Sequence, residues 1–174
     1  MKSPRWHRDE ILLALDLYRT LRLEEMSKKN AKVIALSNLL NEIPIHESKD
    51  ENEKFRNPTG VELKLANFKA IDPDFEGKGL SSYSKKDREV FFEFMGKDEE
   101  LHSIANQIKR AVSSKDLAHK LRQITDEEDY DYSAKEGKVV YKIHKLRERD
   151  SKINTKKKAQ YLEKHGKLDC GLPI

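Results

Sequence analysis

Cysteine is nearly absent from this sequence of 174 residues, which contains Cys170 alone. A single cysteine excludes an internal disulfide and agrees with a reducing compartment. Long apolar runs are absent too, since no stretch approaches the roughly 18 apolar residues that a membrane span needs. The first ten residues also lack the apolar segment of a signal peptide. The sequence therefore predicts a cytoplasmic protein that has no membrane partner.

Apolar residues are scarce as well, at 36% of the chain, whereas charged residues make up 38%. A chain of this length forms one ordinary domain, or one domain with a tail. Apolar side chains recur at helical spacing before residue 122, which predicts a mainly α body with a small core and charged surfaces. The predicted helices, with approximate ends, cover residues 10–28, 31–43, 61–71, 85–95, 98–112 and 114–121.

Short polar side chains stand where several of these helices are expected to begin. We expect Asp9 or a neighbour, Asn30, Asp98 and Ser114 to cap helix starts. The best strand candidate is the run Val139, Val140, Tyr141 and Ile143, which follows Gly137. The expected fold is therefore mainly α, or α+β with a small strand element. It divides into a helical domain over residues 1–135 and a strand with a basic linker over residues 136–174.

Positive charge is concentrated near the end of the chain. Residues 136–168 contain eleven Lys or Arg and four acidic residues, so they carry a surplus of seven positive charges. The whole chain has a net charge of +4, which leaves the remainder mildly acidic. Clustered Lys and Arg favour contact with phosphates, because neutralising a polyanion releases its counterions. The alternative is a solvated helix face or a disordered end.

A second candidate site lies at the Lys54-Phe-Arg-Asn-Pro-Thr-Gly60 segment, where a loop meets a helix start. Such a position presents unpaired backbone N–H groups to an anion, and Lys54, Arg56 and Asn57 add charge and hydrogen-bonding groups. These three residues are candidate DNA contacts. The alternative is local: Asn57 caps the turn, Phe55 fills the core and Arg56 pairs with an acidic residue.

The polar side of the helix that follows carries Lys64, Asn67 and Lys69. Side chains of these types have donors suited to base edges in a major groove, although a solvated helix face has the same composition. The loop at Gly77 and Gly79 either wraps a phosphate or turns a corner. It lacks the spacing and the Lys-Ser/Thr ending of a P-loop.

Basic residues after the predicted strand complete the candidate DNA contacts: His144, Arg147, Arg149, Lys156 and Lys157. His144 has no second ligand or carboxylate at metal-binding spacing, which favours a structural or phosphate-contacting role over a catalytic one. The other histidines are scattered singly, and the sequence contains no recognisable catalytic constellation.

Four segments, in order along the chain, resemble HNH restriction endonucleases, many of which are described as specific for modified cytosine. The central segment contains Phe55-Arg-Asn-Pro58, followed by a Gly-Val pair, Lys64-Leu and Asn67-Phe. In that family a basic segment leads to the first cysteine of a zinc knuckle, and a His-containing catalytic core follows. The resembling segments are residues 6–18, 52–72, 136–150 and 166–170.

The resemblance implies the DNA-binding, specificity-determining region of such an endonuclease without its catalytic module. Cys170 would bind metal only if the missing zinc knuckle were present. A divalent metal and a structural zinc are implied only for that missing module, so no cofactor is expected here. No catalytic residue can be assigned, and whether the chain is itself an enzyme stays open. The chain is expected to be a fragment, or the product of a gene whose second half is lost or encoded separately.

The implied partner is double-stranded DNA, with a homodimer suggested by the need to cut two strands, and no small-molecule substrate. Trp6, Tyr83 and Tyr130 are candidates for an aromatic cage around a flipped base, and the sequence does not rank them or indicate which DNA modification is read. The rival hypothesis is a helical protein-interaction module that exposes a hydrophobic patch and does not bind nucleic acid.

Overall fold

The computed structural model describes residues 4–43, 45–46, 54–77, 79–80, 82–114 and 137–165. This described part of the chain is helical and contains no strand, which confirms the prediction of a mainly α fold. A short 3-10 helix, η1 (Leu23–Glu25), follows the first α-helix. The α-helices are α1 (Arg8–Thr20), α2 (Ala31–Glu42), α3 (Pro58–Ile71), α4 (Lys85–Glu93), α5 (Asp98–Ser113) and α7 (Lys138–His165).

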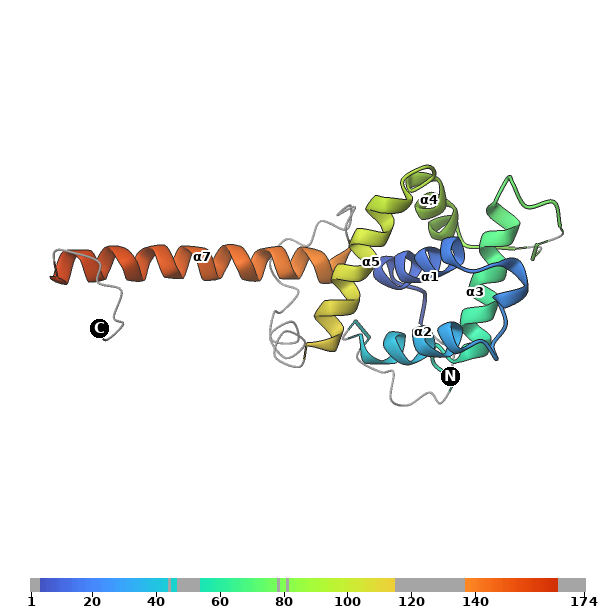
Figure 1. Ribbon diagram of the computed structural model, residues 1–174, viewed down its shortest axis with the longest axis horizontal. Coiled ribbons are helices and arrows are strands. Elements are labelled where there is room, and N and C mark those ends of the chain that lie inside the picture. The colour runs from blue at the N-terminus through green and yellow to red at the C-terminus, as the bar shows by residue number, and fades with distance from the viewer. Residues whose placement is uncertain are drawn as a thin grey trace.

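Helix α1 is the centre of the body, with α2, α3, α4 and α5 packed around it (Figure 1). Its residues from Asp9 to Asp16 are all buried, including five consecutive apolar or small side chains. A helix that is apolar around most of its surface is stable only inside other elements. An aromatic cluster beside it joins α1 to α3 and α4, with the Tyr18 ring 5.6 Å from Phe68 and 6.3 Å from Phe91.

Buried polar groups of α1 have partners on neighbouring helices. Asp16 is 4% exposed and accepts hydrogen bonds from His102 Nδ1 at 2.8 Å and Lys109 Nζ at 2.7 Å, both on α5. Tyr18 donates its hydroxyl to Asp72 at 2.8 Å, and burial together with this carboxylate raises the pKa of Tyr18. These bonds fix how α1 lies against α5 and against the end of α3.

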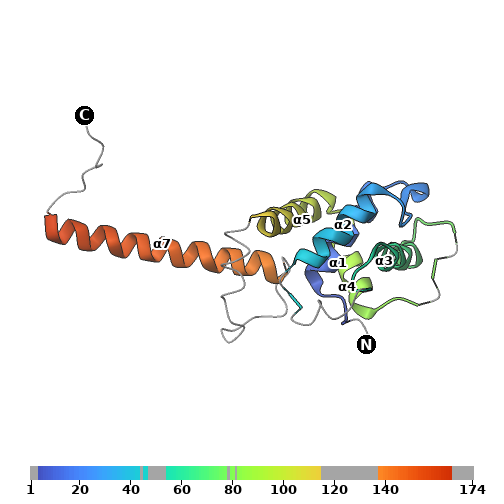
Figure 2. The ribbon, with the colours of Figure 1, turned by 90° about the horizontal axis from the view of Figure 1, so that it is seen from below.

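Helix α7 packs its first turns against α5 and α1 and then projects from the body as a single long rod (Figures 1 and 2). The buried side chains Val139, Val140 and Ile143 lie in its first turns. The predicted strand at these residues is therefore wrong. Their spacing also fits one side of a helix, and burial against α5 overrides the β-propensity of valine and isoleucine.

The start of α7 is held by a carboxylate from the other end of the chain. Asp9, fully buried on α1, accepts hydrogen bonds from the backbone N–H groups of Lys138 at 3.0 Å and Val139 at 3.2 Å. The first turn of an α-helix has N–H groups that its own carbonyls do not reach, and Asp9 caps this turn of α7 from a distance. Gly137 has φ +85°, and a Cβ added there would lie 2.3 Å from Asp9 Oδ1. Only glycine allows this close approach.

Several predicted helix boundaries need correction. The first helix ends at Thr20 rather than near Lys28, and its N-cap is His7, whose backbone N–H donates to Glu10 at 2.7 Å. The third begins at Pro58, where proline's fixed φ suits a first helical position. Asp98 lies inside α5, after the N-cap Lys97.

Asn30 caps α2 as predicted, accepting from the Lys32 N–H at 2.8 Å. Ser114, the expected cap of the next helix, is the C-cap of α5, and residues 115–121 of that predicted helix lie outside the described residues. Among the described residues, no helix combines the length and the apolar character needed to cross a bilayer.

Candidate functional site

A cavity of about 490 Å³ opens between the segment before α1, one side of α3 and the loop that leads into α4. Its lining combines aromatic, apolar, cationic and small polar side chains. The lining residues are Trp6, Lys54, Arg56, Gly60, Leu63, Lys64, Asn67, Leu80, Ser82, Tyr83, Ser84 and Asp87.

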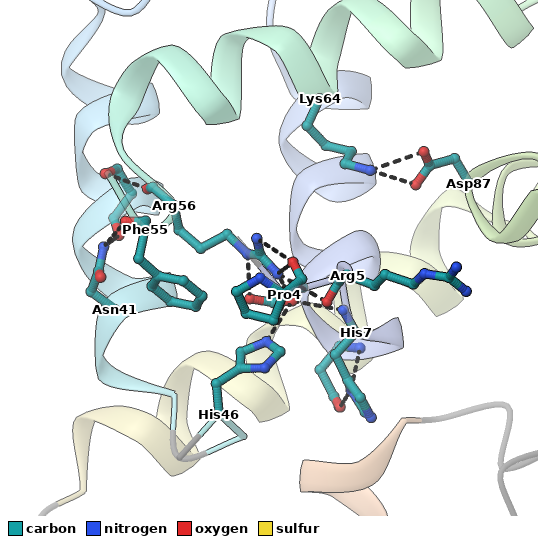
Figure 3. A network of polar contacts seen from close by, with 12 residues as sticks. Pro4, Arg5, His7, Asn41, His46, Phe55, Arg56, Lys64 and Asp87 are labelled. Carbon is teal, nitrogen blue, oxygen red and sulfur yellow. Dashed lines mark hydrogen bonds and ion pairs between the residues drawn. The ribbon is translucent and has the colours of Figure 1, made fainter. Parts of the chain in front are cut away.

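Arg56 forms the innermost polar network of this region (Figure 3). Its Nε donates to Glu10 Oε1 at 2.7 Å, and one terminal nitrogen donates to Glu10 Oε2 at 2.9 Å. The terminal nitrogens also donate to the backbone carbonyls of Pro4 and Arg5, each at 3.1 Å. The guanidinium therefore fastens the segment before α1 to the start of α3 in a bidentate, charge-assisted arrangement.

The backbone of Arg56 is as constrained as its side chain. Its φ of 43° lies in the left-handed region, which costs a residue with a side chain about 1–3 kcal/mol. The Arg56 carbonyl accepts from the Ser37 hydroxyl at 2.8 Å, and the Phe55 carbonyl accepts from the Asn41 amide at 3.3 Å. Both donors lie on α2, so α2 holds the turn in this conformation.

Glu10 is the anion at the centre of the network. Burial would raise the pKa of this carboxyl, but hydrogen bonds from His46 and Arg56, with the guanidinium charge, outweigh burial and hold the pKa below its ordinary value. His46 Nε2 lies 3.1 Å from Glu10 Oε2. The carboxylate therefore stays ionised and compensates the charge of Arg56.

Lys64 and Asp87 form a second buried pair. The Lys64 Nζ donates to both carboxylate oxygens, at 2.7 and 2.9 Å, and the two side chains are 5% and 0% exposed. Burial lowers the pKa of Lys64 despite the opposing effect of Asp87. The pair joins α3 to the first turn of α4, where Asp87 also accepts from the Ser84 N–H at 3.2 Å.

Trp6 lies between the two pairs. The Arg56 guanidinium carbon is 4.5 Å from the Trp6 ring centroid, and the Lys64 Nζ is 4.6 Å from it. Cation–π contacts with partly desolvated cations are worth roughly 1–2 kcal/mol each. The two ion pairs thus hold the indole in place at the wall of the cavity.

The rim of the cavity is apolar and exposed. Leu63 is 51% exposed, Tyr83 43% and Leu80 39%. Gly79 brings the loop against α3, because a Cβ at this position would lie 2.4 Å from the Ala70 backbone. The sequence predicted that this loop either wraps a phosphate or turns a corner. Its close contact with α3 at Gly79 gives it a packing role beside the rim.

Two residues predicted to contact DNA lie inside the protein. Arg56 is 4% exposed and Lys64 is 5% exposed, and each is paired with a carboxylate. Buried and paired in this way, neither side chain presents its charge to DNA, which corrects that prediction. Phe55 is buried, and Asn57 caps α3 by accepting from the Gly60 N–H at 2.8 Å, so the local alternative describes these residues.

The remaining candidates of this region stay near the surface. Lys54 is exposed and Asn67 is partly buried, and both line the cavity. Lys69 is partly buried beside the Phe75 ring, with its Nζ 5.8 Å from the ring centroid.

The candidates on the C-terminal segment fall on α7. His144, Lys156 and Lys157 are exposed, as are Lys152 and Lys158. Arg147 and Arg149 lie in the helix, but their side chains, like Cys170, fall outside the described part of the chain.

The two carboxylates of the site, Glu10 and Asp87, were not predicted from the sequence. Trp6 was predicted only as one of three candidates for an aromatic cage. Asp87 has a local signal, since Ser84 and Asp87 form a capping box at the start of α4. Glu10 likewise closes a capping box with His7 at the start of α1, but its pairing with Arg56, which lies 46 positions away, has no local signal. Long-range pairing of this kind cannot be read from local spacing.

No protein-family model, curated protein or solved structure matches this chain. Within the described ranges, no three His, Cys, Asp or Glu residues gather as a metal site would require.

Proposed function

We propose that this chain binds double-stranded DNA, as the specificity region of an HNH-type restriction endonuclease. The observation that carries the proposal is the exposed lysine cluster of α7, formed by Lys152, Lys156, Lys157 and Lys158. Residues 151–162 of this helix contain no acidic residue. A basic helix that stands clear of the body offers its charges to a polyanion.

The alternative, a merely solvated helix face, predicts acidic residues interspersed with the basic ones. Exposed helices that only face water typically alternate charges at i and i+4, which stabilises them. In α7, Lys152 and Lys156 instead form a like-charged pair at i and i+4, and Lys157 and Lys158 add two more positive charges beside it. That arrangement is unfavourable for the free helix and becomes favourable once phosphates neutralise it.

The test is the salt dependence of duplex affinity in the variant Lys156→Ala/Lys157→Ala/Lys158→Ala. Each lysine that contacts a phosphate contributes about 1 to the slope of log affinity against log salt, so the slope should fall by up to about 3. The affinity loss should be similar for all sequences, because phosphate contacts carry no base information. Fluorescence anisotropy over a range of salt concentrations measures both quantities.

A matched control removes the same charge from the body. Lys28, Lys29 and Lys32, near the start of α2, are also exposed, and their triple alanine variant has the same net charge as the α7 variant. If both variants lower affinity and slope equally, the effect comes from net charge alone and the proposed role of α7 is wrong. Absence of duplex binding by the unaltered protein would overturn the whole proposal.

A protein-interaction module is the second candidate, and one observation favours it. Leu63, Leu80 and Tyr83 form an exposed apolar rim around the cavity. A rim of this kind is typical of surfaces that bind another protein. If that function is the correct one, the unaltered protein should not bind duplex DNA, and a Leu63→Ser/Leu80→Ser variant should abolish its self-association.

A further inference from the structure

We propose that the cavity beside Trp6 binds a single nucleobase that is unstacked from the duplex. This inference rests on the proposed function, because it names what the body recognises while α7 holds the phosphates. Its physical basis is the combination of an aromatic face, a polar edge and a charge-balanced floor in one cavity.

The aromatic face that a base can stack on is that of Tyr83, which is 43% exposed, and the Trp6 indole lines the cavity beside it. Every base has a flat π-face, and stacking on an aromatic side chain is worth roughly 1–3 kcal/mol per base. Arg56 and Lys64 already hold Trp6 in place. The Arg56 guanidinium carbon lies 4.5 Å from the centroid of the indole ring, and the Lys64 Nζ lies 4.6 Å from it. A lining residue fixed before binding loses little conformational entropy when a ligand enters the cavity.

The polar edge comes from Asn67, Ser82 and Ser84. An amide carries both donors and an acceptor, and a hydroxyl can act as either, which matches the mixed donors and acceptors of a base edge. The cavity volume of about 490 Å³ lies within the range of roughly 300–1,000 Å³ usual for small-ligand sites.

The charge balance of the floor argues for a neutral ring rather than a phosphate. Glu10 compensates Arg56 at 2.7 Å, and Asp87 compensates Lys64 at 2.7 Å. A phosphate placed there would meet two carboxylates as well as two cations. The exposed Lys54 lies on the cavity lining, where it can meet the phosphate attached to the bound nucleotide.

Trp6 is the only tryptophan of the chain, so its emission reports directly on the cavity. The experiment compares a fully paired duplex with the same duplex carrying one unpaired base. The unpaired base should quench Trp6 emission and be bound about tenfold more tightly, because its unstacking is already complete. Equal affinity for the two duplexes with unchanged Trp6 emission would overturn the inference.

Two variants separate the cavity from the rest of the protein. Tyr83→Ala and Asn67→Ala should each reduce the preference for the unpaired base, measured as the ratio of the affinities for the two duplexes, to near unity. Phe92→Ala is the matched control, because Phe92 is also 43% exposed but lies on α4 and does not line the cavity. If Phe92→Ala loses the preference as fully as Tyr83→Ala, the cavity is not the site.

Different measurements would overturn the base site in the cavity and the proposed binding of DNA. Salt-dependent binding that α7 lysines control, without any preference for the unpaired base, overturns the cavity inference alone. Absence of duplex binding overturns both. Quenching of Trp6 by a free nucleoside as strong as that by DNA would show a nucleoside site and overturn the DNA source of the base.

Discussion

The cations of the body and the cations of α7 look alike in sequence but have opposite surroundings. Arg56 and Lys64 are almost completely buried, and each faces a carboxylate at 2.7 Å. Lys156, Lys157 and Lys158 are exposed on a helix that leaves the body. The difference teaches that a cation near a loop and a helix start is not by itself an anion site. What decides its role is whether the fold brings an acid to it.

The largest expected effect comes from breaking a buried pair at Arg56. Arg56→Met leaves Glu10 buried without its main partner and frees the carbonyls of Pro4 and Arg5. Removing one member of a buried pair typically costs about 3–5 kcal/mol of unfolding free energy. Urea denaturation measures this loss. A loss below about 1 kcal/mol would show that the pair contributes no more than a surface ion pair.

A somewhat smaller loss is expected at the second pair. Asp87→Asn leaves the Lys64 ammonium without its anion, but Lys64 can lose its proton because burial already lowers its pKa. We expect a loss of about 2–3 kcal/mol. The double variant Lys64→Met/Asp87→Leu should recover most of it, because no buried charge remains. If the double variant lost as much unfolding free energy as the two single variants lose together, these residues would not be coupled.

The contact between Gly137 and Asp9 links the two regions. Gly137→Ala places a methyl group where Asp9 Oδ1 now lies and is strained at φ +85°, so a loss of about 1–2 kcal/mol is expected. Hydrogen exchange should accelerate at the Lys138 and Val139 amides, which Asp9 caps. Faster hydrogen exchange at amides of the body alone, with the exchange rates of the Lys138 and Val139 amides unchanged, would contradict the capping role of Asp9.

Acid should act on the body through Glu10. The folded-state pKa of Glu10 lies below the ordinary value of 4.5, so its contribution to stability is complete above pH 4.5. That contribution is lost as the pH falls from 4.5 through the lowered folded-state pKa. Thermal unfolding between pH 6 and pH 3 should therefore show a steeper decline for the unaltered protein than for Glu10→Gln. Parallel declines would mean that other carboxyls account for the acid sensitivity.

The smallest effect on stability is expected at α7. Lys156→Ala should change the free energy of unfolding by less than about 0.5 kcal/mol, because an exposed lysine loses little packing. The same substitution should lower the salt slope of duplex binding by about 1. A change in stability as large as that of Gly137→Ala would show that Lys156 is part of the folded body.

Local signals in the sequence predicted most of the helices, because apolar spacing and capping residues act within a few positions. Asn30 and Asn57 are examples, since each accepts from an N–H two or three residues later. The strand at Val139–Ile143 was wrong because β-propensity is weak beside burial against α5. The charged site could not be predicted, because Arg56 meets Glu10 and Lys64 meets Asp87 only after α1, α3 and α4 pack together.

Chemical acetylation of lysines, with and without duplex DNA, tests the contrast between body and α7 most directly. Mass spectrometry then gives the modified fraction of each lysine. The account predicts that Lys156, Lys157 and Lys158 react readily in the free protein and are protected by DNA, whereas Lys64 stays unreactive in both samples. Equal modification of the three α7 lysines with and without bound DNA would contradict it.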